Sequence, residues 1–393
     1  MPVPIPQLGS YNFVPETKEN LDWADLTTID LSLYGTPEGR QQLAQTLLKA
    51  VREDGFFYVK NFNISEERVN RQYSIGQHFY ELPLEEKLKH VPEGWAEGKF
   101  NGYVPAGRRV LDPVSGIRDR VEIYNIPKFD GFFEHNHPAI VQDNLDEIEE
   151  FSKVACLCIG FLETLNVQYQ DLHSEILDPL HVLLAIALEL PEDTFTNIHK
   201  YERKSEDHLR YMKYSKYTPE ENRKIGNLWI VGHTDIGSWT LLFRQPVAAL
   251  QVQNHKTGEW KYVKPVDATL TVNTCNALSF LTGGYVLSTI HRLTSPPKDQ
   301  EHVDRLGLLY FSRPNNDVRL NTVKGSPVLE CEGFAQNVFE EGGHPVPTME
   351  QWTFAKQKWQ RTPKNIRGDL ELETAEILPG FREKIYDDYK VAV

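Results

Sequence analysis

The sequence contains little cysteine and no excess of positive charge. Cysteine accounts for 4 of 393 residues, which is too few for a disulfide framework in a chain of this length. Because 56 Asp+Glu outnumber 42 Lys+Arg, the net charge is −14. This balance argues against the classes of protein that bind nucleic acid or an anionic membrane through a basic face.

Long hydrophobic runs are also missing. No apolar run approaches the ~20 residues of a membrane-spanning helix, and the first residues lack the charged and apolar regions of a signal peptide. We therefore expect a cytoplasmic protein without nucleic-acid or membrane partners, whose oligomeric state the sequence leaves open. Cys156 and Cys158 lie one residue apart in an apolar, helical-looking stretch, so we interpret them as reduced core residues and not as zinc ligands.

What is present indicates a globular protein, because 40% of the residues are hydrophobic and 11% are aromatic. The N-terminal half predicts helices around one buried strand. Thr36 and Pro37 begin a helix that Gly55 ends, and His181 is expected to be a hydrogen-bonded structural histidine. The other N-terminal elements expected are a strand over 56–59, a helix over 66–80, a long loop over 94–116, and helices over 145–190 with a stripe of Ile148, Phe151, Ala155, Cys158 and Leu162.

After about residue 205 the pattern changes to short β-rich segments separated by turn residues. Their spacing near ten residues predicts a β-sandwich or barrel. Thr348 and Gln351 match a capping box that begins a C-terminal helix. The predicted strands are 228–231, 239–243, 250–252, 269–272, 277–280 and 306–311.

One group of residues in the β-rich part has the chemistry of a metal site. His233 and Asp235 are two positions apart at the end of a predicted strand, so their side chains point to the same side. His291 could supply a third ligand from another strand. Two histidines and one carboxylate form the facial triad of non-haem Fe(II) oxygenases. Taken alone, the three residues are also consistent with a hydrogen-bonded loop pair and a surface histidine.

Several ordered motifs run along the chain. They are Leu47-x-x-x-Val-x-x-Asp-Gly-Phe-Phe-Tyr-Val59, Phe79-Tyr-x-Leu-Pro-x-Glu-Glu-Lys87, His233-Thr-Asp-x-Gly-x-x-Thr-Leu-Leu242, Ala249-Leu-Gln-Val252, Gly258-x-Trp260, Val272-Asn273, Leu281-Thr-Gly-Gly284 and Ser288-x-x-His-Arg292. Together they resemble one family, the 2-oxoglutarate/Fe(II)-dependent dioxygenases, in the branch of isopenicillin N synthase and the flavonoid and gibberellin oxidases. The family fold is mainly β, with a double-stranded β-helix (jelly roll) core and flanking helices.

The resemblance implies one packed catalytic unit. It would contain an N-terminal dioxygenase module with helices (1–130), a helical support (131–205), the jelly-roll core (206–320) and a C-terminal helical extension (321–393) that could close the pocket. It also implies Fe(II) held by His233, Asp235 and His291, with 2-oxoglutarate and O₂ as cosubstrates. The expected reaction hydroxylates, desaturates or cyclises a small organic substrate of secondary metabolism, and releases succinate and CO₂.

Arg305 matches the arginine of the Arg-x-Ser motif by which the family binds the distal carboxylate of 2-oxoglutarate. An arginine suits this role because it stays charged and binds carboxylate as a fork. Tyr214 best matches a tyrosine that the family offers to the same group, although core packing explains it equally well. Two positions depart from the family pattern, because Gly307 replaces the serine and Met212 replaces an asparagine found in many relatives.

The resemblance also points to three aromatic residues, Phe311, Tyr103 and Trp239, as substrate contacts, with simple packing as the alternative for each. Asn276 is interpreted as a structural turn, and Arg292 as a support or ion-pair residue beside His291. Four alternatives stay open: an oxidase that needs no 2-oxoglutarate, an ethylene-forming enzyme that fragments 2-oxoglutarate, a metal-free binding protein of the same fold, and a zinc hydrolase.

Overall fold

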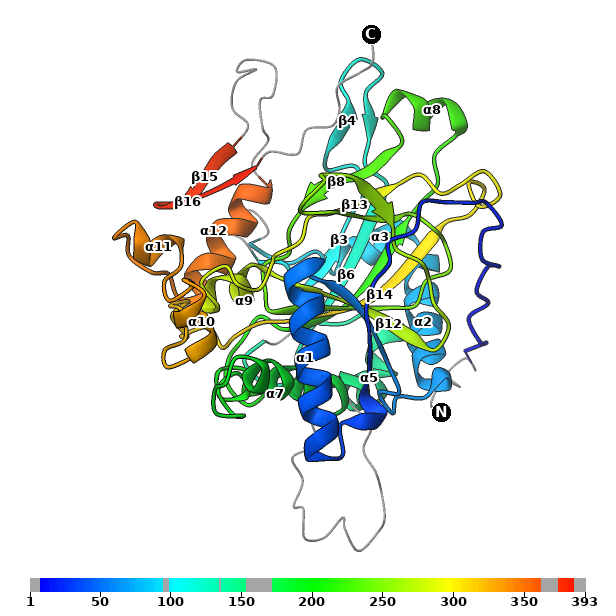
Figure 1. The fold of residues 1–393 in the computed structure, drawn as a ribbon. Coiled ribbons are helices and arrows are strands. Elements are labelled where there is room, and N and C mark those ends of the chain that lie inside the picture. The colour runs from blue at the N-terminus through cyan, green and yellow to red at the C-terminus, as the bar shows by residue number, and fades with distance from the viewer. Residues whose placement is uncertain (1–7, 95–98, 134–135, 153–171, 362–373, 385–393) are drawn as a thin grey trace, which may run out of the picture.

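The computed structural model describes residues 8–94, 99–133, 136–152, 172–361 and 374–384. Helices and long loops surround two β-sheets near the centre of the molecule (Figure 1). Cys156, Cys158 and the second half of the predicted stripe (Ala155 and Leu162) lie outside the described residues. Within the described residues, no helix combines the length and the apolar character needed to cross a membrane.

The N-terminal helices form as the sequence predicts. Helix α1 (Pro37–Glu53) begins where Thr36 Oγ1 accepts a hydrogen bond from the Gly39 backbone N–H at 3.0 Å. Gly55 follows the helix with φ +61°, and a Cβ there would lie 2.2 Å from Thr289 Oγ1, so only glycine fits. Strand β2 (Phe56–Lys60) and helix α2 (Glu66–Glu81) come next, and both confirm the prediction.

The larger sheet has eight strands in the order β1-β2-β12-β9-β14-β7-β6-β3. Strand β1 pairs with β2 in parallel, and every other pair in this sheet is antiparallel. Besides β2, its strands are β1 (Thr28–Asp30), β3 (Gly102–Val104), β6 (Val121–Pro127), β7 (His208–Tyr214), β9 (Trp239–Phe243), β12 (Thr269–Thr274) and β14 (Arg305–Ser312).

The smaller sheet has four antiparallel strands in the order β11-β10-β13-β8. Two separate hairpins complete the described strands. The small sheet contains β8 (Leu228–His233), β10 (Leu250–Gln253), β11 (Trp260–Tyr262) and β13 (His291–Thr294), and the hairpins are β4 (Val110–Asp112) with β5 (Ile117–Arg118) and β15 (Thr374–Leu378) with β16 (Phe381–Lys384).

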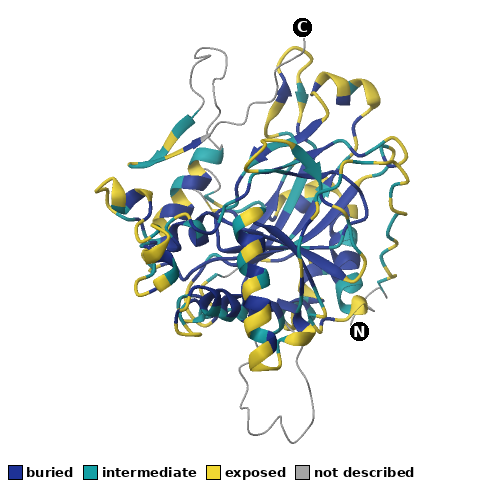
Figure 2. Ribbon diagram, viewed as in Figure 1, coloured by how far each residue is buried: buried dark blue, intermediate teal, exposed yellow. Residues whose placement is uncertain are grey.

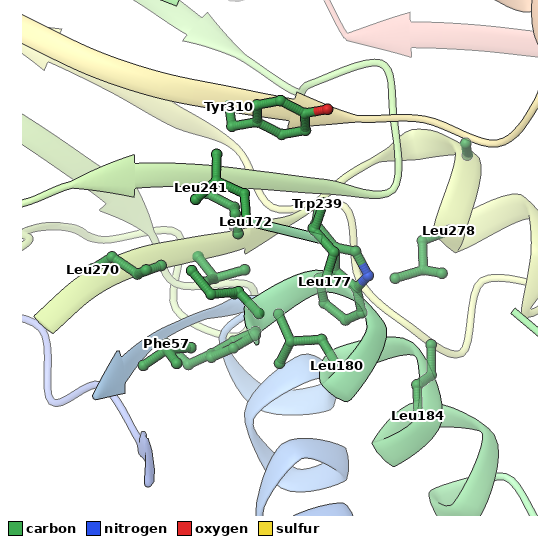
Figure 3. Packing of buried hydrophobic residues seen from close by; sticks show 14 of the residues in the cluster. Phe57, Leu172, Leu177, Leu180, Leu184, Trp239, Leu241, Leu270, Leu278 and Tyr310 are labelled. Atoms are coloured by element: carbon green, nitrogen blue, oxygen red, sulfur yellow. The ribbon is translucent and has the colours of Figure 1, made fainter. Parts of the chain in front are cut away.

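The two faces of the larger sheet are buried by different partners. One face packs on the helices, and Figure 3 shows Trp239, Leu241 and Tyr310 of this sheet together with Leu177 and Leu180 of the helical layer. The opposite face carries residues such as Met212 and Tyr214, which form a second apolar cluster with residues of the smaller sheet. Figure 2 shows the central strands almost entirely buried, whereas the helices expose their outer sides. The face of the larger sheet that carries Met212 and Tyr214 therefore points toward the smaller sheet, and we call it the interior face.

The remaining helices are short, and they lie around the sheets (Figure 1). The capping box is confirmed, because Gln351 N donates to Thr348 Oγ1 at 3.3 Å and Thr348 N donates to Gln351 Oε1 at 2.9 Å. These helices are α3 (Leu84–Leu88), α4 (Ala139–Gln142), α5 (Leu145–Ser152), α7 (Asp178–Ala187), α8 (Pro219–Lys224), α9 (Asn276–Leu281), α10 (Pro327–Cys331), α11 (Val338–Glu341) and α12 (Met349–Arg361), with 3-10 turns at Leu31–Leu33 and Thr196–Ile198 and a π-helical turn at His173–Leu177.

Three expectations were wrong in part. The segment 277–280, predicted as a strand, belongs to helix α9, because the backbone N–H groups of Asn276 and Ala277 donate to carbonyls of the loop after β8 and not to a neighbouring strand. The stretch 94–116 is not all loop, since it contributes β3 and β4. The C-terminal extension is not all helical, since it ends in the β15–β16 hairpin.

His181 also differs from the expectation. The side chain is buried in α7, as predicted, and its ring stacks on His199 with centroids 4.0 Å apart. Among the residues that the structure describes, however, neither ring nitrogen of His181 has a hydrogen-bond partner. Its position is set by packing, because the surrounding helix is apolar on nearly every side.

Candidate metal and cosubstrate site

The structure brings His233, Asp235 and His291 together, although 58 positions separate the two histidines. His233 ends β8, His291 begins β13, and the two residues are direct partners across these strands. Their ring centroids are 4.3 Å apart. One ligand atom from each of the three side chains lies within 4.8 Å of the others, which is the arrangement of a metal-binding group.

Backbone contacts orient both imidazoles in the same way. Nδ1 of His233 is 3.0 Å from the Val231 carbonyl oxygen, and Nδ1 of His291 is 3.1 Å from the Thr289 carbonyl oxygen. Each contact lets Nδ1 carry the proton, so that Nε2 keeps a free lone pair. The two Nε2 atoms face the Asp235 carboxylate at 3.9 and 3.8 Å. The three side chains therefore present two nitrogen donors and one oxygen donor to a common point.

Hydrogen bonds hold the Asp235 carboxylate in place. Oδ2 accepts from Thr240 Oγ1 at 2.7 Å and from Asn273 Nδ2 at 3.0 Å. Burial alone would raise the pKa of Asp235, but His291, His233 and these two donors outweigh it and bring the pKa to about 2. Burial, reinforced by His291, lowers the pKa of His233 to about 3. At neutral pH the group is thus a carboxylate with a neutral imidazole, as a metal requires.

The loop between the ligands is fixed by the C-terminal extension. Thr234 Oγ1 lies within hydrogen-bond distance of Asn276 Oδ1 (3.1 Å), Glu383 Oε1 (3.2 Å) and Lys356 Nζ (3.3 Å). Lys356 of α12 and Glu383 of β16 form an ion pair, and both are buried. Trp352 Nε1 donates to the Ile236 carbonyl at 3.1 Å. The sequence indicates a turn residue at Asn276 but does not predict its contact with Thr234, which lies between two of the candidate metal ligands.

The predicted cosubstrate residues lie opposite one another on the interior face. Arg305 of β14 pairs with Tyr214 of β7, and the guanidinium carbon is 5.3 Å from the tyrosine ring centroid. Arg305 is only 3% exposed, and its Nε has no hydrogen-bond partner among the described residues. A small cavity adjoins it, lined also by Leu242, Gln245 and Thr271. A buried guanidinium with an unused donor beside a cavity fits a carboxylate ligand.

Tyr11 and Gln245 beside Arg305 were missed by sequence reasoning. Burial raises the pKa of Tyr11, while a hydrogen bond with Gln245 and the charge of Arg305 lower it, so all three side chains are neighbours. Gln245 Nε2 in turn donates to the Leu306 carbonyl. No motif marks either residue, because each reaches Arg305 from a distant part of the chain.

The three predicted substrate contacts have different surroundings. Phe311 lies on the interior face, since it pairs with Thr240, whose hydroxyl contacts Asp235. Trp239 is fully buried on the opposite, helix-facing side of β9 (Figure 3), so the predicted substrate contact does not fit its position. Tyr103 is also fully buried in that helix-facing core, and its hydroxyl donates to Glu122 at 2.5 Å.

Arg292, the neighbour of His291, points away from the metal ligands. Successive strand residues face opposite sides, and Arg292 Nε donates to Gln251 Oε1 at 2.8 Å. Its guanidinium carbon lies 4.1 Å from the Trp260 ring centroid. These contacts tie β13 to β10 and β11, so Arg292 supports the small sheet that carries the two histidines.

Two family descriptions match most of the elements that build this site. Residues 26–144 match the family "non-haem dioxygenase in morphine synthesis N-terminal", and residues 206–314 match the "2OG-Fe(II) oxygenase superfamily". The second match includes His233, Asp235, His291 and Arg305. The two matches together cover more than half of the chain.

Curated relatives resemble the chain over most of its length. The chain is 28% identical over 325 residues to a 2-oxoglutarate-dependent dioxygenase, frbA, of a Dothideomycetidae species, covering 78% of this chain and 90% of the relative. It is 26% identical over 324 residues to a 2-oxoglutarate-dependent ethylene/succinate-forming enzyme of Ralstonia nicotianae, covering 75% and 84%.

Solved structures share the fold. A full-length protein of Neurospora crassa in complex with alpha-KG superposes with a TM-score of 0.66 at 24% identity, covering 84% of this chain and 95% of that one. A putative 2OG-Fe(II) oxygenase family protein of Caulobacter crescentus superposes with a TM-score of 0.65 at 18% identity, covering 86% and 99%. From these matches, the chain belongs to the 2-oxoglutarate/Fe(II)-dependent oxygenase superfamily, whose members are oxidoreductases that use Fe(II), 2-oxoglutarate and O₂.

Proposed function

We propose that His233, Asp235 and His291 hold the Fe(II) of this oxygenase, and that Arg305 with Tyr214 binds the distal carboxylate of 2-oxoglutarate. The observation that carries the proposal is the convergence of three ligand atoms within 4.8 Å, with both histidines turned by backbone carbonyls so that Nε2 faces the Asp235 carboxylate. The donor set fits Fe(II), because two imidazoles and one carboxylate leave further positions free for cosubstrates. The buried, unused Nε of Arg305 fits the carboxylate.

When bound, Fe(II), 2-oxoglutarate and O₂ supply the oxidising chemistry, which releases succinate and CO₂ and hydroxylates, desaturates or cyclises a small organic substrate. The chain itself provides position and electrostatics. Thr240 and Asn273 fix the Asp235 carboxylate, and Arg305 supplies a buried positive charge for the distal carboxylate. Phe311 would form a wall of the substrate space, because it lies beside Thr240 on the interior face.

The two sheets would correspond to the halves of a double-stranded β-helix, and their mutual packing supports this. The predicted division into residues 1–130, 131–205, 206–320 and 321–393 within one packed unit belongs to the same proposal. It is supported by a core cluster that runs from Ile29 to Trp352. A cytoplasmic location and the lack of nucleic-acid and membrane partners stay predictions from the acidic composition.

One observation keeps an alternative reaction open. Gly307 offers no hydroxyl beside Arg305, and its cross-strand neighbour Met212 offers only a thioether. This environment differs from the family pattern at the position that binds the cosubstrate. Arg305 would hold a substrate carboxylate in an oxidase that needs no 2-oxoglutarate, and an ethylene-forming enzyme would fragment 2-oxoglutarate itself.

The test measures metal and cosubstrate use separately. Mn(II) binding and Fe(II)-dependent succinate formation are compared for the unchanged protein, His233→Ala, Asp235→Ala and the exposed control His302→Ala. We expect both ligand variants to lose metal binding and succinate formation, with no loss in the control. Full succinate production by either ligand variant would show that the triad assignment is wrong. O₂ consumption without 2-oxoglutarate would favour the oxidase, and ethylene in the headspace would favour fragmentation.

A further inference from the structure

A cluster of positive side chains lies on the interior face of the larger sheet, near the proposed metal ligands. Arg210 belongs to β7, and Arg313 follows the last residue of β14. Arg313 is 3% exposed and Arg210 is partly buried. Neither residue was singled out by the sequence, and neither is needed for the metal or for the predicted cosubstrate contact.

Two aromatic rings and one imidazole hold the guanidinium groups in place. The rings of His208 and Phe311 are stacked, with centroids 4.8 Å apart and planes at 11°. The Arg210 guanidinium carbon lies 4.3 Å from the Phe311 centroid, and the Arg313 guanidinium carbon lies 5.0 Å from the Phe100 centroid. Arg210 Nη2 donates to His208 Nε2 at 3.1 Å. The two cations thus each lie against an aromatic ring.

Neither guanidinium has a carboxylate partner among the described residues. Arg210 Nε donates to the neutral Asn125 Oδ1 at 2.7 Å. Nε and Nη1 of Arg313 have no hydrogen-bond partner in the described part of the chain. Glu206 and Asp207 are charged neighbours of Arg313, but neither forms an ion pair with the guanidinium, and Asp207 Oδ1 accepts from the Arg313 backbone N–H at 2.8 Å. Buried charges are normally paired, so donors left unused at this depth point to a ligand.

His208 does not neutralise the cluster. Burial, together with the charges of Arg210 and Arg313, lowers the pKa of His208 well below its usual range, so the ring is neutral. Its Nδ1 lies 3.0 Å from the Glu206 carbonyl oxygen, which leaves Nε2 to accept from Arg210. The cluster therefore carries two positive charges and an oriented, uncharged imidazole.

The cluster faces the metal ligands. Phe311 lies opposite both His208 and Thr240, and the Thr240 hydroxyl donates to Asp235. Arg313 also touches the loop that carries Asp235, because a Cβ on Gly237 would lie 2.9 Å from Arg313 Cγ. Glycine at that position gives the arginine stem room to pass. A group held here would place the rest of its molecule next to the metal.

The cluster is distinct from the cosubstrate end of the site. Arg305 and Arg313 are eight residues apart, and an extended strand of that length spans about 26 Å. 2-Oxoglutarate is too short to bridge such a distance along the strand. Its distal carboxylate, if held by Arg305, cannot also satisfy Arg313. A second anionic group is therefore needed for Arg210 and Arg313.

We propose that Arg210 and Arg313 bind a carboxylate of the substrate, whose apolar body packs against Phe311 and Phe100. This inference rests on the proposed function, since it assigns the substrate class of the same site. A carboxylate fits because planar guanidinium groups bind it as a fork. A single negative charge is favoured over a phosphate dianion, because Glu206, Asp207 and Asp235 lie close by and add negative charge of their own.

Binding to the intact, Mn(II)-loaded protein tests the proposal without knowledge of the natural substrate. With 2-oxoglutarate at saturation, acetate, benzoate and phenylacetate are each titrated by calorimetry against the matching neutral amide. We expect at least one carboxylate to bind tenfold or more tightly than its amide. Arg210→Gln and Arg313→Gln should each abolish that preference, while the exposed control Arg319→Gln keeps it. Arg313→Lys, which retains the charge and loses the fork, should reduce the preference.

Three results would overturn the proposal: no carboxylate preferred over its amide, a preference that survives both glutamine variants, or an unchanged preference in Arg313→Lys. The same samples report Mn(II) and 2-oxoglutarate affinity. If the unchanged protein binds neither Mn(II) nor 2-oxoglutarate, the proposed function itself is wrong, and not only the substrate assignment. If Arg210→Gln and Arg313→Gln weaken 2-oxoglutarate while Arg305→Gln does not, the carboxylate belongs to the cosubstrate and the substrate proposal is wrong.

Discussion

Gly307 and Met212 face each other across β14 and β7, and Met212 Cβ lies 3.8 Å from the place that a Cβ on Gly307 would take. The thioether thus lies beside the position where the family has a serine hydroxyl. Tyr214 OH lies 3.4 Å from Met212 Sδ, so this phenol contacts sulfur next to Arg305. At the proposed cosubstrate end of the site, Arg305 thus has a soft, apolar neighbour where the family pattern has a polar one.

Restoring the hydroxyl should tighten 2-oxoglutarate binding. In Gly307→Ser the new Cβ would lie 3.6 Å from Arg305 Nη1 and 3.3 Å from Leu309 Cδ1, the end of a flexible side chain. One added hydrogen bond to a charged group is worth ~1.5–3 kcal/mol, so we expect the Kd for 2-oxoglutarate to fall about tenfold. Calorimetry measures it. Gly307→Ala is the control, and equal Kd values for the two variants would show that the hydroxyl does not reach the carboxylate.

The donors to Asp235 should matter for metal affinity. Asn273→Ala and Thr240→Val each remove one hydrogen bond to Oδ2 without removing a ligand. Loss of such a partner typically weakens metal binding by about 10–100-fold, so we expect that range for Mn(II) measured by titration. The control is Thr269→Val, which lies on β12 with Asn273. The Thr269 hydroxyl donates to the Val266 carbonyl and not to Asp235. Wild-type Mn(II) affinity in both test variants would contradict a positioning role.

Removing one partner of the buried ion pair between Lys356 and Glu383 should lower the stability of the fold. Lys356→Met leaves the buried Glu383 without its cation, which we expect to reduce the free energy of unfolding by about 3–5 kcal/mol in a urea titration. The double variant Lys356→Met/Glu383→Leu should recover part of this loss, because no uncompensated charge remains. Lys204→Met, in an exposed pair with Glu350, should change stability far less. A double variant worse than the single one would refute this account.

Buried histidines should make the fold sensitive to acid. Burial lowers the pKa of His199 to about 4, below the 6.5 of an unfolded histidine. Between pH 6.5 and pH 4 this histidine binds a proton in the unfolded chain but not in the folded chain. Its contribution to the free energy of unfolding is therefore fully present above pH 6.5 and is lost as the pH falls toward 4. His199→Gln should reduce the slope of unfolding free energy against pH by about 1.4 kcal/mol per unit. Exposed His302→Gln is the control, and an unchanged slope in His199→Gln would contradict the prediction.

The sequence was most informative where local chemistry decides the structure. Thr36 and Pro37 begin α1 as predicted, because a side-chain cap and a fixed φ act within a single turn. The two-residue spacing of His233 and Asp235 correctly places both side chains toward one space, since the ligand atoms do converge. The even spacing of Arg305 and Phe311 also places them on one face of β14, as their cross-strand partners confirm.

What the sequence could not supply was decided by distant contacts. Short apolar segments form strands or helices equally well, and 277–280 became helical because carbonyls of the loop after β8 accept from its first N–H groups. The structure places Trp239 on the helix-facing side of β9, because its neighbour Thr240 is the residue directed at Asp235, and that follows from strand register. Arg210 and Arg313 lack any motif, and they stand out only because neither forms an ion pair with a carboxylate among the described residues.

The contact between Thr234 and Glu383 joins positions 149 residues apart. A ribosome therefore produces both histidines of the proposed iron site well before it produces the carboxylate that contacts the loop after His233. Until α12 and β16 have been synthesised and docked, this loop lacks Lys356, Glu383 and the Trp352 contact. The proposed iron site can therefore reach its final geometry only after the C-terminal extension has been synthesised.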